Sequence, residues 1–166
     1  MAQTYSFDVT TGVDLQEVDN AVNQAQKEIG QRYDFKGSKA SIEFQRAEST
    51  LALVADNDFQ MTALFDVLKS KLIKRGVPVK NLDVGKIEQA GGDTVRRSVK
   101  LVTALDSDTA KKVAAAIKEA KLKKVQASIQ AEQVRVTAPD KDALQDAIQL
   151  LRKGDYGVEL KFGNYR

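Results

Sequence analysis

The same order of secondary-structure patterns occurs twice along the chain. Residues 4–89 and 94–163 each alternate between strand-like and helix-like hydrophobic periods, in the order strand, helix, strand, strand, helix, strand. This order is the split βαβ, or ferredoxin-like, arrangement. We therefore expect an α+β protein built from two ferredoxin-like (RNP-like) βαββαβ domains in tandem. Each domain should be an antiparallel sheet with both helices on one face, because each helix has a single apolar stripe.

Local signals fix the start of each copy. Tyr5–Thr10 alternates apolar and polar residues, which predicts a half-buried strand. Asp14 with Glu17 predicts a variant of the capping box at the start of a helix, and Asp106 or Asp108 can cap the corresponding helix of the second copy. Gly91-Gly92 predicts a turn between the copies, so the sequence favours domains at 1–91 and 92–166. The pattern leaves open whether a strand is exchanged between them.

Residue types that the chain lacks exclude much catalytic chemistry. It contains no His and no Cys, and neither of the common glycine-rich phosphate loops. We therefore expect no enzyme, no catalytic residue, no metal site and no cofactor. No apolar run reaches the roughly 18 residues of a membrane span, and residues 1–13 lack the pattern of a signal peptide. A cytoplasmic protein without membrane contact is the expectation, since absent Cys fits a reducing compartment.

Charge is distributed unevenly between the expected halves. Residues 1–90 hold 11 Lys and Arg against 13 Asp and Glu, whereas residues 91–166 hold 15 against 10. A basic half favours a phosphate-bearing ligand, and an ordinary solvated surface is the alternative.

The clearest basic cluster surrounds the glycine turn. It consists of Lys86, Arg96, Arg97 and Lys100, whose side chains are suited to phosphate. Strand alternation places Arg96 and Arg97 on opposite faces, so that one of them has a structural role. The same alternation predicts a basic open face on the second domain, formed by Arg96, Lys100, Arg135 and Lys161. The alternative is a solvated hairpin tip.

A second candidate site is the segment Arg32–Gly37. Tyr33 or Phe35 can stack on a base while Arg32 or Lys36 contacts phosphate. The alternative is a connection whose aromatic side chains close the edge of the core. The expected central strands, Leu51–Ala55 and Val134–Thr137, contain no aromatic residue, which argues against base stacking of the RNA-recognition type.

Several short motifs together resemble one bacterial family. They are Ser6-Phe7-Asp8-Val9, Arg32-Tyr33-Asp34-Phe35-Lys36-Gly37, Gly91-Gly92 followed by Val95-Arg96-Arg97, Lys123-Lys124-Val125-Gln126-Ala127, and Asn164-Tyr165-Arg166. With these motifs the chain resembles the YajQ family over essentially its whole length. The resemblance implies a tandem of RNP-like domains that binds nucleotides, with some members linked to tRNA and some to cyclic di-GMP signalling.

The residues and the resemblance together predict a non-enzymatic nucleotide-binding protein. Phosphate groups would be held by Arg96, Arg97, Lys100 and Lys86 near the hairpin between the domains, with Arg32, Tyr33, Phe35 and Lys36 at the base or ligand edge. Two alternatives remain open. One is an adaptor that responds to cyclic di-GMP and acts through a regulatory protein partner, and the other is a protein that binds tRNA or other RNA.

Overall fold

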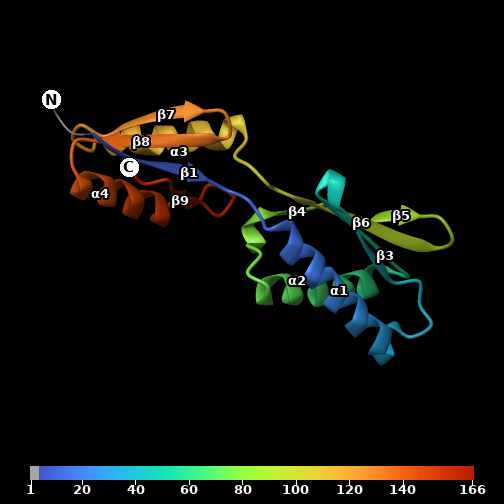
Figure 1. Cartoon of the computed structure of the whole chain (residues 1–166). Helices are drawn as coiled ribbons and strands as arrows, with labels where there is room; N and C mark the ends of the chain where they lie inside the picture. The colour runs from blue at the N-terminus through green and yellow to red at the C-terminus, as the bar shows by residue number, and fades with distance from the viewer. Residues whose placement is uncertain (1–3) are drawn as a thin grey trace. The chain divides into compact units, whose positions relative to one another are not determined.

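The computed structural model describes residues 4–166, which form two compact units. The continuous unit is Val13–Val102, and the split unit joins residues 4–12 to Thr103–Arg166. Each unit consists of an antiparallel sheet and two helices (Figure 1). The expected ferredoxin-like α+β fold is therefore confirmed for both units.

The continuous unit has its sheet strands in the order β2-β3-β6-β4, and β5 also pairs with β6. Its helices are α1 (Leu15–Gln31) and α2 (Asp58–Lys74), and its strands are β2 (Ser41–Gln45), β3 (Thr50–Ala55), β4 (Leu82–Val84), β5 (Glu88–Ala90) and β6 (Thr94–Leu101). Short 3₁₀ turns lie at Tyr33–Phe35, Arg46–Glu48 and Val79–Asn81.

The split unit has the strand order β7-β8-β1-β9. Its strands are β1 (Tyr5–Thr10), β7 (Gln126–Gln130), β8 (Gln133–Ala138) and β9 (Lys161–Gly163), and its helices are α3 (Ser107–Glu119) and α4 (Lys141–Lys153). All neighbouring strands are antiparallel in both sheets.

The two copies of the pattern exchange their first strands. β1 precedes α1 in the sequence, yet it pairs with β8 and β9 in the split unit. β6 precedes α3, yet it pairs with β3 and β4 in the continuous unit. This division differs from the boundary expected at residue 91 and shows the strand exchange that the sequence left open. The physical reason is that both strands have the same alternating pattern, so either one fits the central position of either sheet.

The charge difference between the expected halves nearly disappears with the exchange. The continuous unit holds 14 Lys and Arg against 13 Asp and Glu, and the split unit holds 12 against 10. The cationic residues of β6 belong to the less basic unit. Net charge therefore does not mark either unit as the phosphate-binding one.

Side-chain caps start all four long helices where the sequence places them. Asp14, Asn57, Asp106 and Asp140 each accept a hydrogen bond from a backbone N–H in the first turn. Such a cap satisfies one of the unpaired donors at a helix start and contributes about 1 kcal/mol. The caps expected at Asp14 and Asp106 are confirmed, and capping explains the three aspartates without catalytic chemistry.

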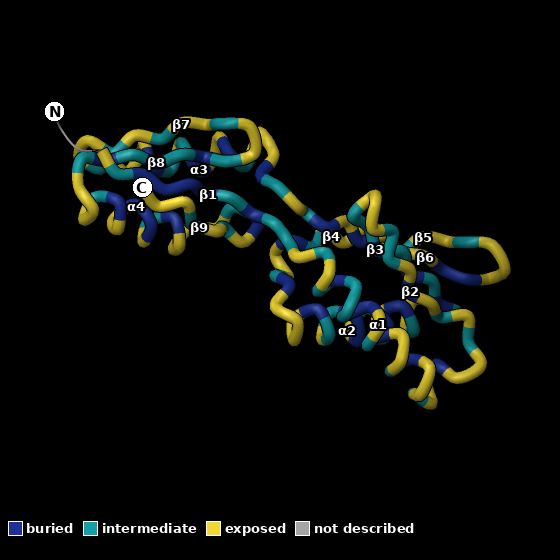
Figure 2. The backbone as a smooth tube through the Cα atoms, viewed as in Figure 1, coloured by how far each residue is buried: buried dark blue, intermediate teal, exposed yellow. Residues whose placement is uncertain are grey.

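Each unit has a core between its sheet and its helices, which appears as the dark inner faces in Figure 2. In the continuous unit, α1 and α2 contribute Val18, Val22, Leu64 and Leu68, and the sheet contributes Leu51, Leu53, Val99 and Leu101. In the split unit, Phe7 and Val9 of β1 are fully buried, as are Val134 and Val136 of β8. Both exchanged strands therefore supply central core residues to the unit that they join.

The strand segment formed by residues 82–90 is interrupted by a bulge. β4 and β5 both pair with β6, and residues 85–87 lie opposite only Arg97 and Ser98. Gly85 donates its backbone N–H to the Ser98 carbonyl at 2.8 Å. A Cβ at Gly85 would lie 2.9 Å from that oxygen, so only glycine fits at this point. The interruption is local, because both parts of the strand stay in the same sheet.

Within the described chain, no helix has both the length and the apolar character required to span a bilayer.

The exchange predicts an asymmetry between fragments of the chain. A fragment of residues 13–102 contains every strand and helix of its unit and should unfold cooperatively on heating. A fragment of residues 1–91 lacks β6, the strand between β3 and β4, and should stay unfolded or aggregate. Circular dichroism with thermal melting checks both. Cooperative melting of 1–91 and no folding of 13–102 would contradict the observed division.

Candidate functional site

The uncovered face of the continuous unit's sheet presents three polar side chains of β6. Register and burial place Val95, Val99 and Leu101 on the helix-covered face, and Arg96, Ser98 and Lys100 on the opposite face. β6 lies inside the sheet, so this row is central rather than at an edge. The sequence thus correctly predicted that Arg96 and Lys100 share a solvent-facing row.

Acidic residues border this row on one side only, in β4 and β5, whereas β3 on the other side presents Val54, Ala52 and Thr50. Arg96 lies opposite Glu88 of β5 and forms an ion pair with it at 3.4 Å, with both side chains about 60% exposed. Lys100 lies opposite Asp83 of β4, although no ion pair joins them. An exposed pair such as Arg96–Glu88 is worth about 0–1 kcal/mol, so an incoming anion can replace the carboxylate at little cost.

Arg97 belongs to the covered face. It lies opposite Leu53, and its guanidinium is 5.7 Å from the ring centroid of Phe65 on α2. Its Nε atom is buried and has no hydrogen-bond partner within the described chain. The structure therefore separates Arg97 from Arg96 and Lys100 and gives it a packing role against α2.

Lys86 occupies the bulge between β4 and β5. Its side chain is exposed and makes no ion pair within the part of the chain described. The neighbouring Ile87 packs against the core, and Glu88 pairs with Arg96. Lys86 is therefore a free cation near the border of the Arg96 row.

The segment Arg32–Gly37 divides into structural and exposed side chains. Arg32 pairs with Asp34 at 2.7 Å and Glu28 at 3.5 Å and lies over the Phe35 ring at 5.1 Å. Phe35 is 5% exposed and belongs to the core. The hydrogen bonds to these carboxylates raise the pKa of Arg32, Asp34 having the larger effect. Phe35 thus packs in the core, which agrees with the alternative of an aromatic side chain at the core edge, and Arg32 is engaged with its neighbours.

Tyr33 and Lys36 are the parts of this segment that face solvent. Tyr33 is 93% exposed, and Lys36 is exposed and makes no ion pair in the described chain. Gln60 of α2 donates to the Asp34 carbonyl, which holds the segment near the start of α2. No hydrogen bond or ion pair between described residues joins residues 32–37 to Lys86, Arg96, Arg97 or Lys100. The two predicted clusters lie in one unit but do not contact each other.

The expected open face with Arg96, Lys100, Arg135 and Lys161 is wrong. Arg96 and Lys100 belong to the sheet of the continuous unit, whereas β8 and β9 carry Arg135 and Lys161 in the split unit. Arg135 is also occupied, because its Nε donates to Asp8 at 2.9 Å. The exchange of β1 and β6 is the cause, since alternation along a strand does not tell which sheet the strand joins.

Asp8 is the centre of a polar cluster on the split unit's sheet. It accepts hydrogen bonds from Arg135 and, at 2.6 Å, from Asn164. The hydrogen bond from Arg135 is the main reason why the pKa of Asp8 lies below its usual range. This carboxylate stays ionised and links β1, β8 and the C-terminal residues, which is a structural task.

A lysine-rich surface on the split unit was not singled out from the sequence. We call the lysine surface the six exposed lysines of α3 and the turn after it, Lys111, Lys112, Lys118, Lys121, Lys123 and Lys124. None of them forms an ion pair with a described residue. Only Asp108 and Glu119 are acidic in that stretch, so a charge count over a short window would have found it.

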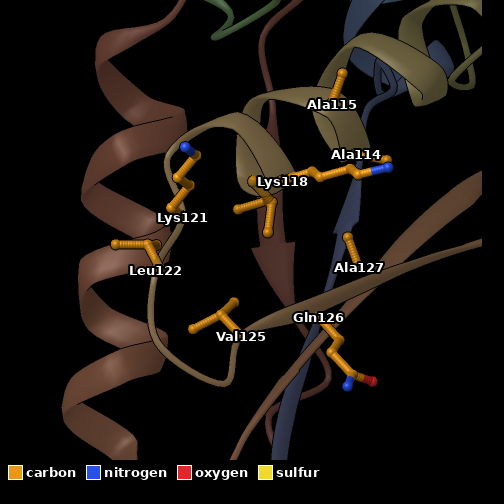
Figure 3. A pocket seen from close by; sticks show the side chains of 9 residues that line it. Ala114, Ala115, Lys118, Lys121, Leu122, Val125, Gln126 and Ala127 are labelled. Carbon is orange, nitrogen blue, oxygen red and sulfur yellow. The ribbon is translucent and has the colours of Figure 1, made fainter.

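The lysine surface borders a cavity of about 470 Å³ between α3 and the edge strand β7. Lys118 projects from the end of α3 and Lys121 from the following turn, above Leu122 and Val125 (Figure 3). Lys121 and Lys124 both have positive φ, at 52° and 61°, a conformation that costs a residue with a Cβ about 1–2 kcal/mol. The turn therefore holds two lysines in fixed, unfavourable backbone positions.

Comparison with known proteins gives consistent results over the full chain. The family model described as "Nucleotide-binding protein YajQ-like" matches residues 5–166. A protein named "Nucleotide-binding protein" from Desulfitobacterium hafniense (strain DSM 10664 / DCB-2) is 52% identical over 166 residues, covering 100% of both chains. A protein of the same name from Chloroherpeton thalassium is 45% identical over the same coverage. The similarity therefore extends to both units.

The placement of the two neighbouring arginines predicts unequal losses of stability. Arg97→Ala removes the contact with Phe65 and should lower the free energy of unfolding by about 0.5–2 kcal/mol. Arg97→Met keeps an apolar stem there and should restore most of this loss. Arg96→Ala removes only an exposed pair and should cost about 0–1 kcal/mol. Urea titrations measure all three. Equal losses for Arg96→Ala and Arg97→Ala would contradict the assignment.

Proposed function

The chain belongs to the YajQ-like family, and we propose that it binds a nucleotide, without consuming it, on the uncovered face of the continuous unit's sheet. The relatives' name, nucleotide-binding protein, supports the ligand class. The observation that carries the location is the row Arg96, Ser98 and Lys100 on a face that no helix covers.

The geometry of the row suits a phosphate group. Successive residues on one face of a strand are about 7 Å apart, so Arg96 and Lys100 flank Ser98 at about equal distances. Long cationic side chains on both sides can reach a phosphate placed over the central hydroxyl, which would donate to a phosphate oxygen. Lys86, exposed in the adjacent bulge, adds a further positive charge near the border. Arg97 is not part of this site, since it contacts Phe65 on the other face.

Glu88 competes with the phosphate for Arg96. The ion pair at 3.4 Å must open before Arg96 can turn to a ligand. Its exposure keeps that cost at about 1 kcal/mol or less. Glu88 therefore lowers affinity for anions by a modest factor and lowers nonspecific occupation of the row.

Binding without turnover follows from the residue types of the chain. It has no His and no Cys, and its acidic residues at helix starts are engaged in capping. Tyr33 and Lys36 remain candidates for an additional contact with a base or a ligand edge, because both are exposed. The alternative ligand is cyclic di-GMP, in which case the protein would act as an adaptor through a regulatory protein partner. The same binding experiments should therefore include cyclic di-GMP.

Charge reversal of the row provides the test. Arg96→Glu with Lys100→Glu should weaken ATP, GTP or cyclic di-GMP binding at least about tenfold, because each charge-assisted contact is worth about 1.5–3 kcal/mol. Glu88→Gln should tighten it by up to about fivefold. Lys74→Glu with Lys80→Glu makes the same change in net charge elsewhere and serves as the control. Calorimetry measures affinity, and chromatography afterwards should recover the nucleotide intact.

If the folded Arg96→Glu and Lys100→Glu double variant kept the wild-type affinity for the nucleotide, the proposed location on this sheet face would be contradicted. Product that persists through repurification and disappears in a point variant would show an enzyme instead.

A second function, RNA binding, is favoured by the lysine surface. The six exposed lysines form no ion pair with a described residue, although Lys123 and Lys124 share a cavity with Asp140, Asp142 and Asp146. Such lysines attract a polyanion, and the phosphate backbone of RNA offers regularly repeated charge. The cavity beside Lys118 and Lys121 interrupts this surface with apolar side chains that a base can contact (Figure 3). The uncovered sheet faces lack aromatic side chains, so phosphate contacts would dominate over sequence readout.

RNA binding through this surface predicts a steep dependence on salt. Lys118→Glu with Lys121→Glu should flatten the slope of log affinity against log salt by about 0.7 for each phosphate that these lysines neutralise in the wild type. Lys74→Glu with Lys80→Glu is again the matched control. Fluorescence anisotropy with a labelled single-stranded RNA at several salt concentrations measures the slope. Equal slopes for the wild type and the Lys118 and Lys121 variant would contradict this function.

A further inference from the structure

A cavity of about 360 Å³ lies in the split unit between α4 and the residues that flank the sheet. Its walls include Tyr5 at the start of β1, Lys141, Gln145 and Ile148 of α4, and the C-terminal Tyr165 and Arg166. We call it the α4 cavity. Its size lies at the lower end of the roughly 300–1,000 Å³ that small-molecule sites occupy, which is enough for one nucleotide unit.

The wall formed by the C-terminal residues is fixed by the sheet. The backbones of Arg166 and Ser6 exchange two hydrogen bonds, at 2.9 and 3.1 Å. Asn164 has a positive φ of 54°, and its side chain donates to Asp8 at 2.6 Å. These contacts hold Tyr165 between two anchored residues. The wall is therefore formed before any ligand arrives.

Two tyrosines give the α4 cavity an aromatic character. The Tyr165 ring lies 6.2 Å from the ring of Phe7, which is fully buried, and Tyr165 remains 59% exposed. One side of the Tyr165 ring therefore packs against Phe7, while much of the ring remains accessible to a ligand. Tyr5 lies on the adjacent strand, and the buried Leu144 and Ile148 contribute apolar surface. Such walls favour a flat ring.

The charges around the α4 cavity are positive. Lys141 lies 5.5 Å from the centroid of the Tyr5 ring, and Arg166, whose charge also acts on Asp8, lines the same cavity. Neither forms an ion pair within the described chain, and none of the described side chains that line the cavity is acidic. The acidic residues of α4, Asp142 and Asp146, line a different cavity on another side of the helix. Lys141 is also the first residue of α4, where the helix dipole favours an anion.

We infer that the α4 cavity binds a single nucleoside monophosphate. The base lies against Tyr165 and the apolar side chains, and the phosphate lies between Lys141 and Arg166. Gln145 has both a donor and an acceptor for the edge of the base. The volume accommodates one base and excludes a complete cyclic dinucleotide. This inference rests on the proposed function for the class of ligand, but it places the ligand in the other unit.

The test compares whole ligands with their parts on the full chain. Calorimetry with AMP, GMP, CMP and UMP should show binding, whereas adenosine and inorganic phosphate should each bind at least about tenfold more weakly than AMP. Tyr165→Leu should weaken AMP binding by about 5- to 150-fold, while Tyr165→Phe keeps the ring and the affinity. Lys141→Glu should weaken it at least tenfold, and Lys153→Glu, at the exposed end of the same helix, should not.

The outcomes separate this inference from the proposed function. In one outcome, Tyr165→Leu and Lys141→Glu keep the wild-type affinity, whereas the Arg96→Glu and Lys100→Glu double variant loses it. This result overturns binding in the α4 cavity and supports the site on the sheet. The reverse result supports the cavity and overturns the sheet site. No binding of any nucleotide by the wild type overturns both. Lys141 is exposed, so Lys141→Glu should fold. Its affinity for AMP therefore tests the α4 cavity even if Tyr165→Leu fails to fold.

Discussion

The exchange of β1 and β6 determines the rest of the architecture. Each is the first strand of its copy of the pattern, and each becomes a central strand in the sheet of the other unit. The exit of each strand is held by a buried polar residue. Thr11 donates to the Glu159 carbonyl at 2.6 Å after β1, and Asn81 bonds both backbone groups of Val102 after β6. These bonds fix where the chain leaves one unit for the other.

The exchange also decides which side chains can act together. Arg96 and Lys100 lie beside the acidic residues of β4 and β5, so their row has a nearly balanced charge. In the split unit, β1 brings Asp8 to Arg135 and Tyr5 to Lys141. The lysine surface and the α4 cavity carry further cations that form no ion pair with a described residue. Local clusters of positive charge can therefore attract phosphate groups although the net charge of the whole chain is only +3.

Local features of the sequence were sufficient to predict the helices and strands, but they were insufficient to predict which strands pair with one another. The caps at Asp14 and Asp106, the strand Tyr5–Thr10 and the opposite faces of Arg96 and Arg97 all follow from short-range patterns that the structure confirms. Pairing of β1 with β8 joins residues more than a hundred positions apart, and no local pattern encodes that choice. The α4 cavity has the same origin, since Tyr5 and Tyr165 come from opposite ends of the described chain.

The exchange has a consequence for how the two units form. The continuous unit is an uninterrupted segment whose core lies entirely within residues 13–102, so it can fold from its own contacts. The split unit must bring Gly12 and Thr103 together, and closing a flexible loop of that length costs about 4 kcal/mol by chain entropy alone. Prior folding of the continuous unit would remove most of that freedom, because it fixes both ends of the segment between β1 and β8. We therefore expect the split unit to depend on its neighbour for its assembly, and with it both of its candidate sites, the lysine surface and the α4 cavity, since pairing of β1 with β8 completes their sheet.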